Sequence, residues 1–312
     1  MALSTPAISL RHISKHYGKL KAVADLSLVV HPGEIVGFLG LNGAGKTTTI
    51  RILLDLLRPS AGEAFIFGKD CQKQGLEARS LTGYLPGEMG LYPDLTGRET
   101  LELLGGLSPQ PVDKVYRGEL CERLELSERD LHRKLREYST GMKRKLGLVQ
   151  AFQADPPLLI LDEPTEGLDP LIQTAFYDLL VQIRQRGRAV FMSSHTLPEV
   201  ERVCDRIALL RGGELVLLSG VAEIRKLAAR RVQASFVEDV IVPPLPPGIE
   251  LVERKPRSWD LRVKGNIGPL VRILGSFPVR DMAIEEARLE DVLARYYREG
   301  QHRKGEPREG EQ

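Results

Sequence analysis

The sequence feature that most constrains the fold is the glycine-rich segment GLNGAGKT at residues 40–47. It follows an apolar run at 35–39 and precedes a helical pattern at 48–57. The spacing matches GxxxxGK[ST], a phosphate-binding loop between a strand and a helix. Glycines let the backbone wrap phosphate oxygens, and the helix N-terminus adds about half a positive charge. The segment therefore predicts an α/β domain that binds a nucleotide.

The residues of this loop have distinct expected roles. We expect Lys46 to bridge the β- and γ-phosphates and the Thr47 hydroxyl to coordinate Mg²⁺. The predicted cofactors are accordingly ATP and Mg²⁺. The expected nucleotide contacts from the loop and the start of its helix are Gly40, Leu41, Asn42, Gly43, Ala44, Gly45, Lys46, Thr47 and Thr48.

A second apolar run, at 158–162, ends in the carboxylates Asp162 and Glu163. Such a run is typical of a buried parallel strand. We expect Asp162 to be a metal-binding residue that holds Mg²⁺ through the water shell of the ion. We expect Glu163 to act as a general base that polarises the attacking water. The alternative, an acidic surface turn, is disfavoured because the charges follow directly on a core strand. The two motifs together predict an enzyme that hydrolyses a nucleoside triphosphate.

The N-terminal part of the chain, residues 1–221, alternates β-rich runs with helical patterns, as a wound sheet does. Strands are expected at 8–12, 26–30, 35–39, 158–162, 189–193 and 206–210. A charged, helical insert at about 91–153 is expected to form a helical subdomain. It opens near TGRE at 96–99, which has the spacing of a capping box.

The sequence pattern changes after residue 221. Residues 222–298 contain a proline-rich segment flanked by strand-like runs, then helical patterns at 267–275 and 289–298. We expect a small α+β accessory domain there. Residues 299–312 mix charges without apolar residues and are expected to be a disordered tail.

Composition excludes several classes of protein. Lys and Arg number 44 against 42 Asp and Glu, so no bulk charge indicates a nucleic-acid partner. No apolar stretch approaches the roughly 20 residues of a membrane-spanning helix, and the N-terminus lacks the pattern of a signal peptide. The cysteines, without a CxxC pair, favour buried reduced thiols. We expect a cytoplasmic chain. The basic runs at 143–145 and 184–188 are interpreted as solvated helix surface.

The order of the motifs resembles that of ABC transporter ATPases. Residues 138–143, YSTGMK, resemble the signature motif of this family, residues 167–169, GLD, resemble its D-loop, and His195 resembles its switch histidine. The resemblance covers roughly 7–220. It implies a P-loop ATPase core with antiparallel β and helical subdomains. The wording YSTGMKRKL is similar to the branch that serves ABC-2 type exporters, including drug and antibiotic-resistance ATPases.

The resemblance also implies roles for single residues. Ser139 and Gly141 would meet the γ-phosphate of an ATP held by a second copy of the subunit. His195 would join Glu163 and Lys46 in catalysis by donating to the γ-phosphate. Tyr17 would stack on adenine, although a strand-end tyrosine with no such role is the simpler interpretation of that residue alone.

The chain departs from the commonest family pattern in two places. The signature has Thr140 and Met142 where many members carry Gly and Gln, and the second departure is Gly87. Gly87 stands where the family usually carries the Q-loop glutamine, which reaches the Mg²⁺ site and links it to the membrane partner. Glu88 could substitute for it, or the link could run through the backbone, and the sequence leaves both open.

The resemblance implies an ATPase subunit that forms a homodimer with a second copy of itself. The dimer would drive an integral-membrane permease from the inner face of the cell membrane.

 ABC-2 type export is the leading interpretation. An import ATPase with a regulatory C-terminal domain, or a non-transport ABC ATPase, remains the alternative. Too few residues separate Lys46 from Ser139 for the long coiled coil of DNA-repair members, and the chain has one cassette where translation factors have two.

Overall fold

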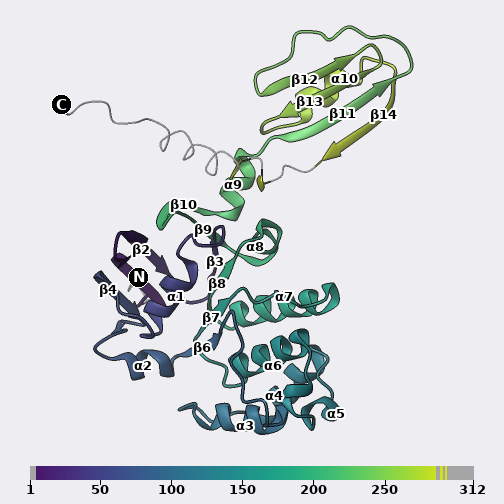
Figure 1. The fold of residues 1–312 in the computed structure, drawn as a ribbon. Coiled ribbons are helices and arrows are strands. Elements are labelled where there is room, and N and C mark those ends of the chain that lie inside the picture. The colour runs from purple at the N-terminus through teal and green to yellow at the C-terminus, as the bar shows by residue number, and fades with distance from the viewer. Residues whose placement is uncertain (1–4, 286–288, 291, 294–312) are drawn as a thin grey trace, which may run out of the picture. The chain divides into compact units, whose positions relative to one another are not determined.

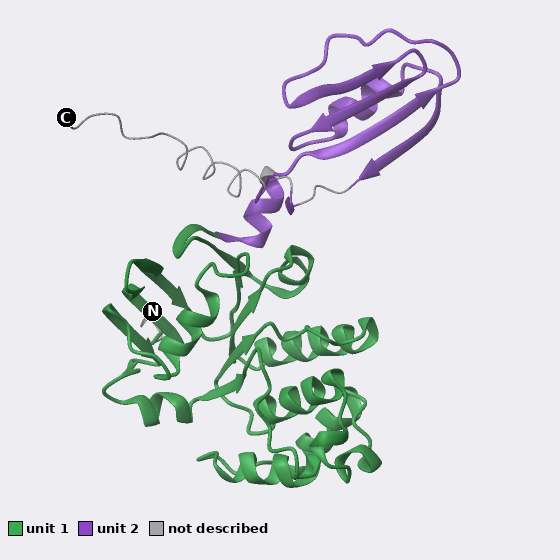
Figure 2. Ribbon diagram, viewed as in Figure 1, with its two compact units in different colours: residues 1–218 green, residues 219–312 purple. Residues whose placement is uncertain are grey.

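The protein is described by a computed structural model that covers residues 5–285, 289–290 and 292–293. The chain divides into two compact units, Met1–Leu218 and Ser219–Gln312 (Figure 2). The sequence places a domain boundary after residue 221, and independent folding of the two parts stays a prediction. The expected tail at 299–312 and most of the expected helix at 289–298 lie outside the described residues.

The central sheet of unit 1 has the strand order β10-β9-β3-β8-β7-β6 (Figure 1). β3 pairs in parallel with β8 and β9, and β7 pairs in parallel with β6 and β8. The carboxyl ends of β3, β7 and β8 therefore emerge at one edge of the sheet. The bounds of its strands are β3 Ile35–Leu39, β6 Thr82–Leu85, β7 Leu158–Asp162, β8 Ala189–Ser194, β9 Arg206–Arg211 and β10 Glu214–Gly220.

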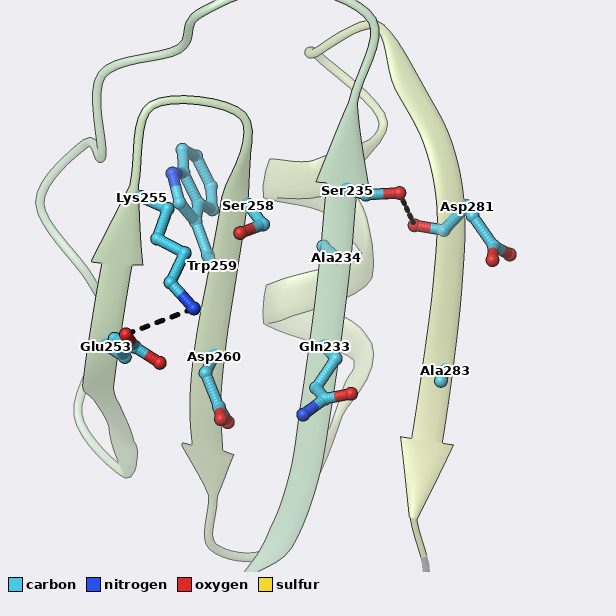
Figure 3. Close-up of a pocket in the computed structure, with 10 residues that line it drawn as sticks. All are labelled: Gln233, Ala234, Ser235, Glu253, Lys255, Ser258, Trp259, Asp260, Asp281 and Ala283. Atoms are coloured by element: carbon cyan, nitrogen blue, oxygen red, sulfur yellow. Dashed lines mark hydrogen bonds and ion pairs between the residues drawn. The ribbon is translucent and has the colours of Figure 1, made fainter.

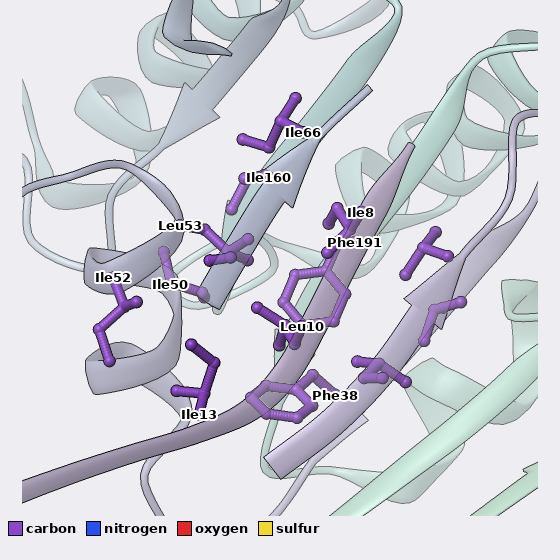
Figure 4. Packing of buried hydrophobic residues seen from close by; sticks show 14 of the residues in the cluster. Ile8, Leu10, Ile13, Phe38, Ile50, Ile52, Leu53, Ile66, Ile160 and Phe191 are labelled. Carbon is purple, nitrogen blue, oxygen red and sulfur yellow. The ribbon is translucent and has the colours of Figure 1, made fainter. Parts of the chain in front are cut away.

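A second sheet in unit 1 has the order β2-β1-β4-β5, and its β1–β2, β1–β4 and β4–β5 pairs are antiparallel. Its strands are β1 Ile8–Tyr17, β2 Leu20–Val30, β4 Ala61–Ile66 and β5 Lys69–Asp70. Figure 4 shows the apolar cluster that joins this sheet, α1 and the central sheet, with Phe38 against Phe191 at a ring-centroid distance of 4.9 Å. This core fixes the phosphate-binding loop between the two sheets.

Helices surround the central sheet and form the insert. Those outside the insert are α1 Lys46–Leu53, α2 Gly75–Ser80, α7 Pro170–Gln185 and α8 Leu197–Val203. The insert holds α3 Gly97–Gly106, α4 Lys114–Arg123, α5 Glu128–Leu131, the 3₁₀ turn Leu135–Glu137 and α6 Thr140–Phe152. The capping box is confirmed, because the Thr96 side chain accepts from the Glu99 amide and the Glu99 carboxylate accepts from the Thr96 amide.

These elements confirm the predicted fold class, an α/β P-loop core with antiparallel β and helical subdomains. Some element bounds differ from expectation. The helix expected at 48–57 spans Lys46–Leu53, because Asp55 takes a left-handed φ of 55°. Strands β4, β5, β6 and β10 were not among the expected ones, since they are short or carry mixed polar and apolar residues.

Unit 2 is a small α+β unit. Its sheet has the order β12-β13-β11-β14, with the antiparallel strands β11 Arg230–Phe236, β12 Ile249–Lys255, β13 Ser258–Val263 and β14 Val279–Glu285. Its helices among the described residues include α9 Val221–Leu227 and α10 Gly268–Leu274. Trp259 is buried in the core of this unit, with its ring 4.5 Å from Phe236 and 5.1 Å from Phe277 between centroids.

Two expectations from composition can be compared with the structure. Cys71, Cys121 and Cys204 are buried free thiols, as expected, and burial raises the pKa of each, that of Cys71 to about 12. Among the described residues, no helix combines the length and apolar character needed to cross a membrane.

The two cores give a test of independent folding. Phe38→Ala removes a buried ring from unit 1 and should lower the free energy of unfolding of that unit by about 3–5 kcal/mol. The one tryptophan of the chain, Trp259, lies in unit 2, so its fluorescence follows that unit during urea denaturation while circular dichroism follows both. We expect Phe38→Ala to move the circular dichroism transition alone. The matched variant Phe236→Ala should move the fluorescence transition together with the unit 2 part of the circular dichroism change. A shift of the fluorescence transition by Phe38→Ala would contradict independent folding.

Candidate functional site

The loop after β3 requires glycine where its backbone turns most sharply. Gly43 and Gly45 have φ values of 79° and 108°, which L side chains rarely adopt. A Cβ at Gly45 would also lie 2.5 Å from the Ala22 carbonyl oxygen. The loop then enters α1 at Lys46, so the amides of the first helical turn lie beside the loop.

Three predicted catalytic side chains form one chain of contacts. Lys46 is 6% exposed, and its Nζ donates to the Gly40 carbonyl at 2.5 Å and lies 3.2 Å from Glu163 Oε1. The other Glu163 oxygen, Oε2, lies 2.8 Å from His195 Nδ1. Because a carboxylate only accepts, the histidine nitrogen donates in this pair. The parallel strands β3, β7 and β8 thus bring together residues far apart in sequence.

Ser193 holds the Asp162 carboxylate and the Glu163 backbone. The Ser193 hydroxyl donates to Asp162 Oδ1 at 2.5 Å and accepts from the Glu163 amide at 3.0 Å. Glu163 has a φ of 49°, a left-handed conformation that is uncommon for a residue other than glycine. Strain of this kind costs about 1–3 kcal/mol and persists only where the surroundings hold it, often at functional sites.

A cavity of about 750 Å³ opens beside these residues. Asn42, Thr47, Asp162 and Glu163 are among the residues that line it. Hydroxyl and carboxylate oxygens are the ligands that Mg²⁺ prefers, so Thr47 and Asp162 suit that ion. The cavity is large enough for a phosphate chain.

The other expected loop residues surround Lys46. Ala44 and Gly45 are buried, Thr48 is half-buried, and Leu41, Asn42, Gly43 and Thr47 are exposed. A Cβ at Gly40 would lie 2.7 Å from the Leu210 carbonyl oxygen, so that position also requires glycine.

Tyr17 lies apart from the cavity lining, at the end of β1. Its side chain is 49% exposed, and Lys15 Nζ lies 5.3 Å from its ring centroid. The ring is therefore available at the surface, and its contact with adenine stays a prediction.

The signature segment forms the start of α6. Ser139 is the exposed N-cap residue, and its Oγ accepts from the Met142 amide at 3.2 Å. A Cβ at Gly141 would lie 2.9 Å from the Gly167 carbonyl oxygen, so glycine lets the segment approach the expected D-loop closely. Within the described chain, Ser139 and Gly141 lie outside the lining of the cavity.

The interpretation of the basic run at 143–145 as solvated surface is wrong for Arg144, which is 3% exposed. Its guanidinium donates to the carbonyl oxygens of Pro86, Gly87, Asp162 and Glu163. Burial lowers its pKa from the ordinary value, while the carboxylates of Glu166, Asp162 and Glu163 oppose that shift. Helical spacing could have revealed this, because Arg144 shares a face with Leu148 and Phe152 at i+4 and i+8.

The run at 184–188 needs a similar correction. Arg184 and Arg188 are half-buried and form ion pairs with Asp205 and Asp155, each at 2.6 Å. They stabilise the contact of this segment with neighbouring parts of unit 1.

Glu199 on α8 is a further residue that sequence reasoning missed. Its carboxylate accepts from the Thr165 hydroxyl at 2.6 Å and from the Ser194 hydroxyl at 2.7 Å. It thus joins the segment after Glu163 to the residue before His195. No sequence signal could have identified it, because its partners come from two separate segments, the loop after β7 and the end of β8.

A hollow of about 350 Å³ in unit 2 has a different character (Figure 3). It lies over the sheet of that unit, where Lys255 pairs with Glu253 at 3.2 Å and Ser235 Oγ donates to the Asp281 carbonyl at 3.4 Å. Asp260, which also lines it, is paired with Arg231. Because these polar groups are satisfied by one another, the hollow does not resemble a phosphate site.

Comparison with known proteins supports one family. The family model described as ABC transporter matches residues 23–166. An uncharacterised ABC transporter ATP-binding protein of Nostoc sp. is 41% identical over 209 residues, 66% of this chain and 62% of that protein. The Nod factor export ATP-binding protein I of Burkholderia lata is 38% identical over 212 residues, 67% of this chain and 69% of that protein. A solved structure of an ATP binding subunit of an ABC transporter is 32% identical, with a TM-score of 0.66 over 71% of this chain and 92% of that chain.

The position of Lys46 leads to a binding prediction. Lys46→Ala should weaken ATP binding by about 10–100-fold, because hydrogen bonds to charged groups contribute about 1.5–3 kcal/mol. Isothermal titration calorimetry of the full chain with ATP measures this directly. Lys69→Ala, which removes a lysine from the surface pair with Glu77, is the matched control and should leave the affinity unchanged. Equal affinities of wild type and Lys46→Ala would refute the assignment of the loop.

Proposed function

Because the chain belongs to the ABC transporter family, we propose that it is the subunit that binds and hydrolyses ATP, dimerises on ATP and drives a separate membrane permease. The observation that carries this proposal is the Lys46–Glu163–His195 chain of contacts beside the cavity. A phosphate-binding loop, a cation and a carboxylate at one sheet edge are the parts that phosphoryl transfer to water needs.

The contacts of Glu163 suggest how it becomes a base. Lys46 Nζ lies on Oε1, and a bound γ-phosphate would draw this ammonium toward its own oxygens. Oε1 would then be free to accept a proton from the attacking water, while His195 keeps Oε2 in place. Thr47 and Asp162 would hold Mg²⁺, which supplies neutralisation of the charge on the phosphates.

The exposed start of α6 supports the proposal that the subunit dimerises on ATP. Ser139 presents its hydroxyl and the helix N-terminus to solvent, and both favour an anion. We assign Ser139 and Gly141 to the γ-phosphate of ATP held by the loop of a second copy. In this arrangement ATP itself joins the subunits, and hydrolysis separates them.

An apolar groove on unit 1 supports the proposal of a permease partner. It has a volume of about 360 Å³ and is lined in part by Leu56, Tyr92 and Leu103, whose side chains are 63%, 66% and 46% exposed. Exposed apolar surface of this kind marks an interaction site. Tyr84, Pro86 and Met89 line both this groove and the phosphate cavity, so a helix docked in the groove would contact the segment that borders the ATP.

Export is the direction we propose, and the subunit would then work at the inner face of the cell membrane. The relative from Burkholderia lata is named as an export protein, and the similarity covers two thirds of this chain. An import ATPase would share the same cassette chemistry, so direction rests on this relationship and on the signature wording.

The general-base assignment gives the test of catalysis. Glu163→Gln should retain ATP binding and lower turnover by about 10²–10⁴-fold, because an amide fits the site but accepts no proton from water. Phosphate release measures turnover, and light scattering should detect an ATP-stabilised dimer. Adding Ser139→Arg to the Glu163→Gln chain should dissociate that dimer, while each subunit still binds ATP. Wild-type turnover by Glu163→Gln would show that another residue is the base.

The groove gives the test of the permease partner. Leu103→Glu places a charge in the apolar groove and should reduce severalfold the fraction of the chain that sediments with membranes of the producing cells. Val115→Glu, at another exposed apolar position of the insert, is the matched control. ATP turnover of the purified chain should stay unchanged in both. Equal membrane fractions for Leu103→Glu and wild type would contradict docking in this groove.

A further inference from the structure

Arg144 lines the ATP cavity and bonds to Pro86, a residue that also lines the apolar groove. Its Nη1 donates to the Pro86 and Gly87 carbonyl oxygens at 2.6 and 3.1 Å. Its Nη2 donates to the Asp162 carbonyl at 2.9 Å and to the Glu163 carbonyl. One guanidinium therefore joins α6, the segment after β6 and the end of β7.

The segment after β6 borders both cavities. Pro86 and Met89 line the ATP cavity and the apolar groove. A displacement of Pro86 or Gly87 would be transmitted to Arg144, because their carbonyl oxygens accept from it. The same guanidinium holds the residues that follow β7, so a short mechanical path leads from the groove to Glu163.

Gly87 has no side chain that could connect the apolar groove with the residues at the end of β7. A Cβ added to Gly87 would lie 3.3 Å from Asp162 Oδ2, which is closer than most Cβ atoms in proteins come to a neighbouring atom. The neighbouring Glu88 is exposed. The backbone carbonyl of Gly87 is instead bonded to Arg144.

The Glu163 backbone is bonded on both sides. Its amide donates to the Ser193 hydroxyl, and its carbonyl accepts from Arg144 and from the Glu166 amide at 3.2 Å, while its φ is 49°. A rotation of this peptide would turn the Glu163 side chain relative to the phosphates. Holding the carbonyl therefore helps to hold the carboxylate.

We propose that Arg144 is the positioning residue that links the segment at 86–87 to Glu163, in place of a side chain at position 87. This inference rests on the proposed function, because it gives Glu163 the role of base. The planar guanidinium is suited to the task, since its donors are fixed in a fork that can serve two pairs of carbonyl oxygens at once. A lysine ammonium keeps the charge but has one nitrogen, so it cannot reach both pairs.

The test compares ATP affinity with turnover in the full chain. Arg144→Lys should keep its dissociation constant for ATP within about threefold of wild type and lower kcat about tenfold or more, as small displacements of catalytic groups do. Arg144→Met should lower kcat further. The matched control, Arg136→Lys, changes an exposed arginine that pairs with Asp94 in the same insert, and it should leave both quantities unchanged.

The outcomes separate this inference from the proposed function. A wild-type kcat in Arg144→Lys would overturn the inference about Arg144. A loss of kcat in Glu88→Gln, with none in Arg144→Lys, would overturn it as well. Parallel loss of ATP affinity and thermal stability, with kcat unchanged in the ATP-saturated chain, would show a merely structural role and also overturn it. If Arg144→Met fails to fold, Arg144→Lys still decides. A wild-type chain without ATP turnover would instead overturn the proposed function itself.

Discussion

The parallel pairing of β3, β7 and β8 is the constraint on which the candidate site depends. Each strand contributes little chemistry by itself, but their carboxyl ends lie at one edge of the sheet. Lys46, Glu163 and His195 each follow one of these strands, and the sheet brings them into contact. Helix α1 and the apolar cluster behind the loop then keep that edge in place.

Two buried cations serve different purposes at this edge. Lys46 has one carbonyl and one carboxylate as neighbours, so an arriving phosphate can replace the carboxylate without leaving the ammonium unpaired. Arg144 is held by four backbone carbonyl oxygens, and removing it would take a charged donor from each of them, although the Glu163 oxygen keeps the Glu166 amide. The lysine can therefore exchange partners during the reaction, whereas the arginine keeps its partners and fixes the backbone.

Local motifs explain how much of the fold and site could be predicted from the sequence. The phosphate-binding loop, the acidic strand end and the capping box each lie within a few consecutive residues, so their spacing carries the information. Arg144 and Glu199 act through partners in other segments, and Arg144 bonds to backbone oxygens that leave no trace in residue type. Three consecutive basic residues suggested solvent exposure, but the structure buries Arg144 and leaves Lys143 and Lys145 half-buried.

Gly87 shows why a departure from a family motif need not remove a connection. A glutamine at this position acts with its own side chain, whereas glycine leaves its carbonyl available to a guanidinium from another helix. The backbone then carries the contact, and the arginine supplies the reach that the missing side chain would have given. The cost is rigidity, because a bond to a carbonyl oxygen moves only when the segment itself moves. A coupling built in this way responds to displacement of the loop rather than to rotation of one side chain.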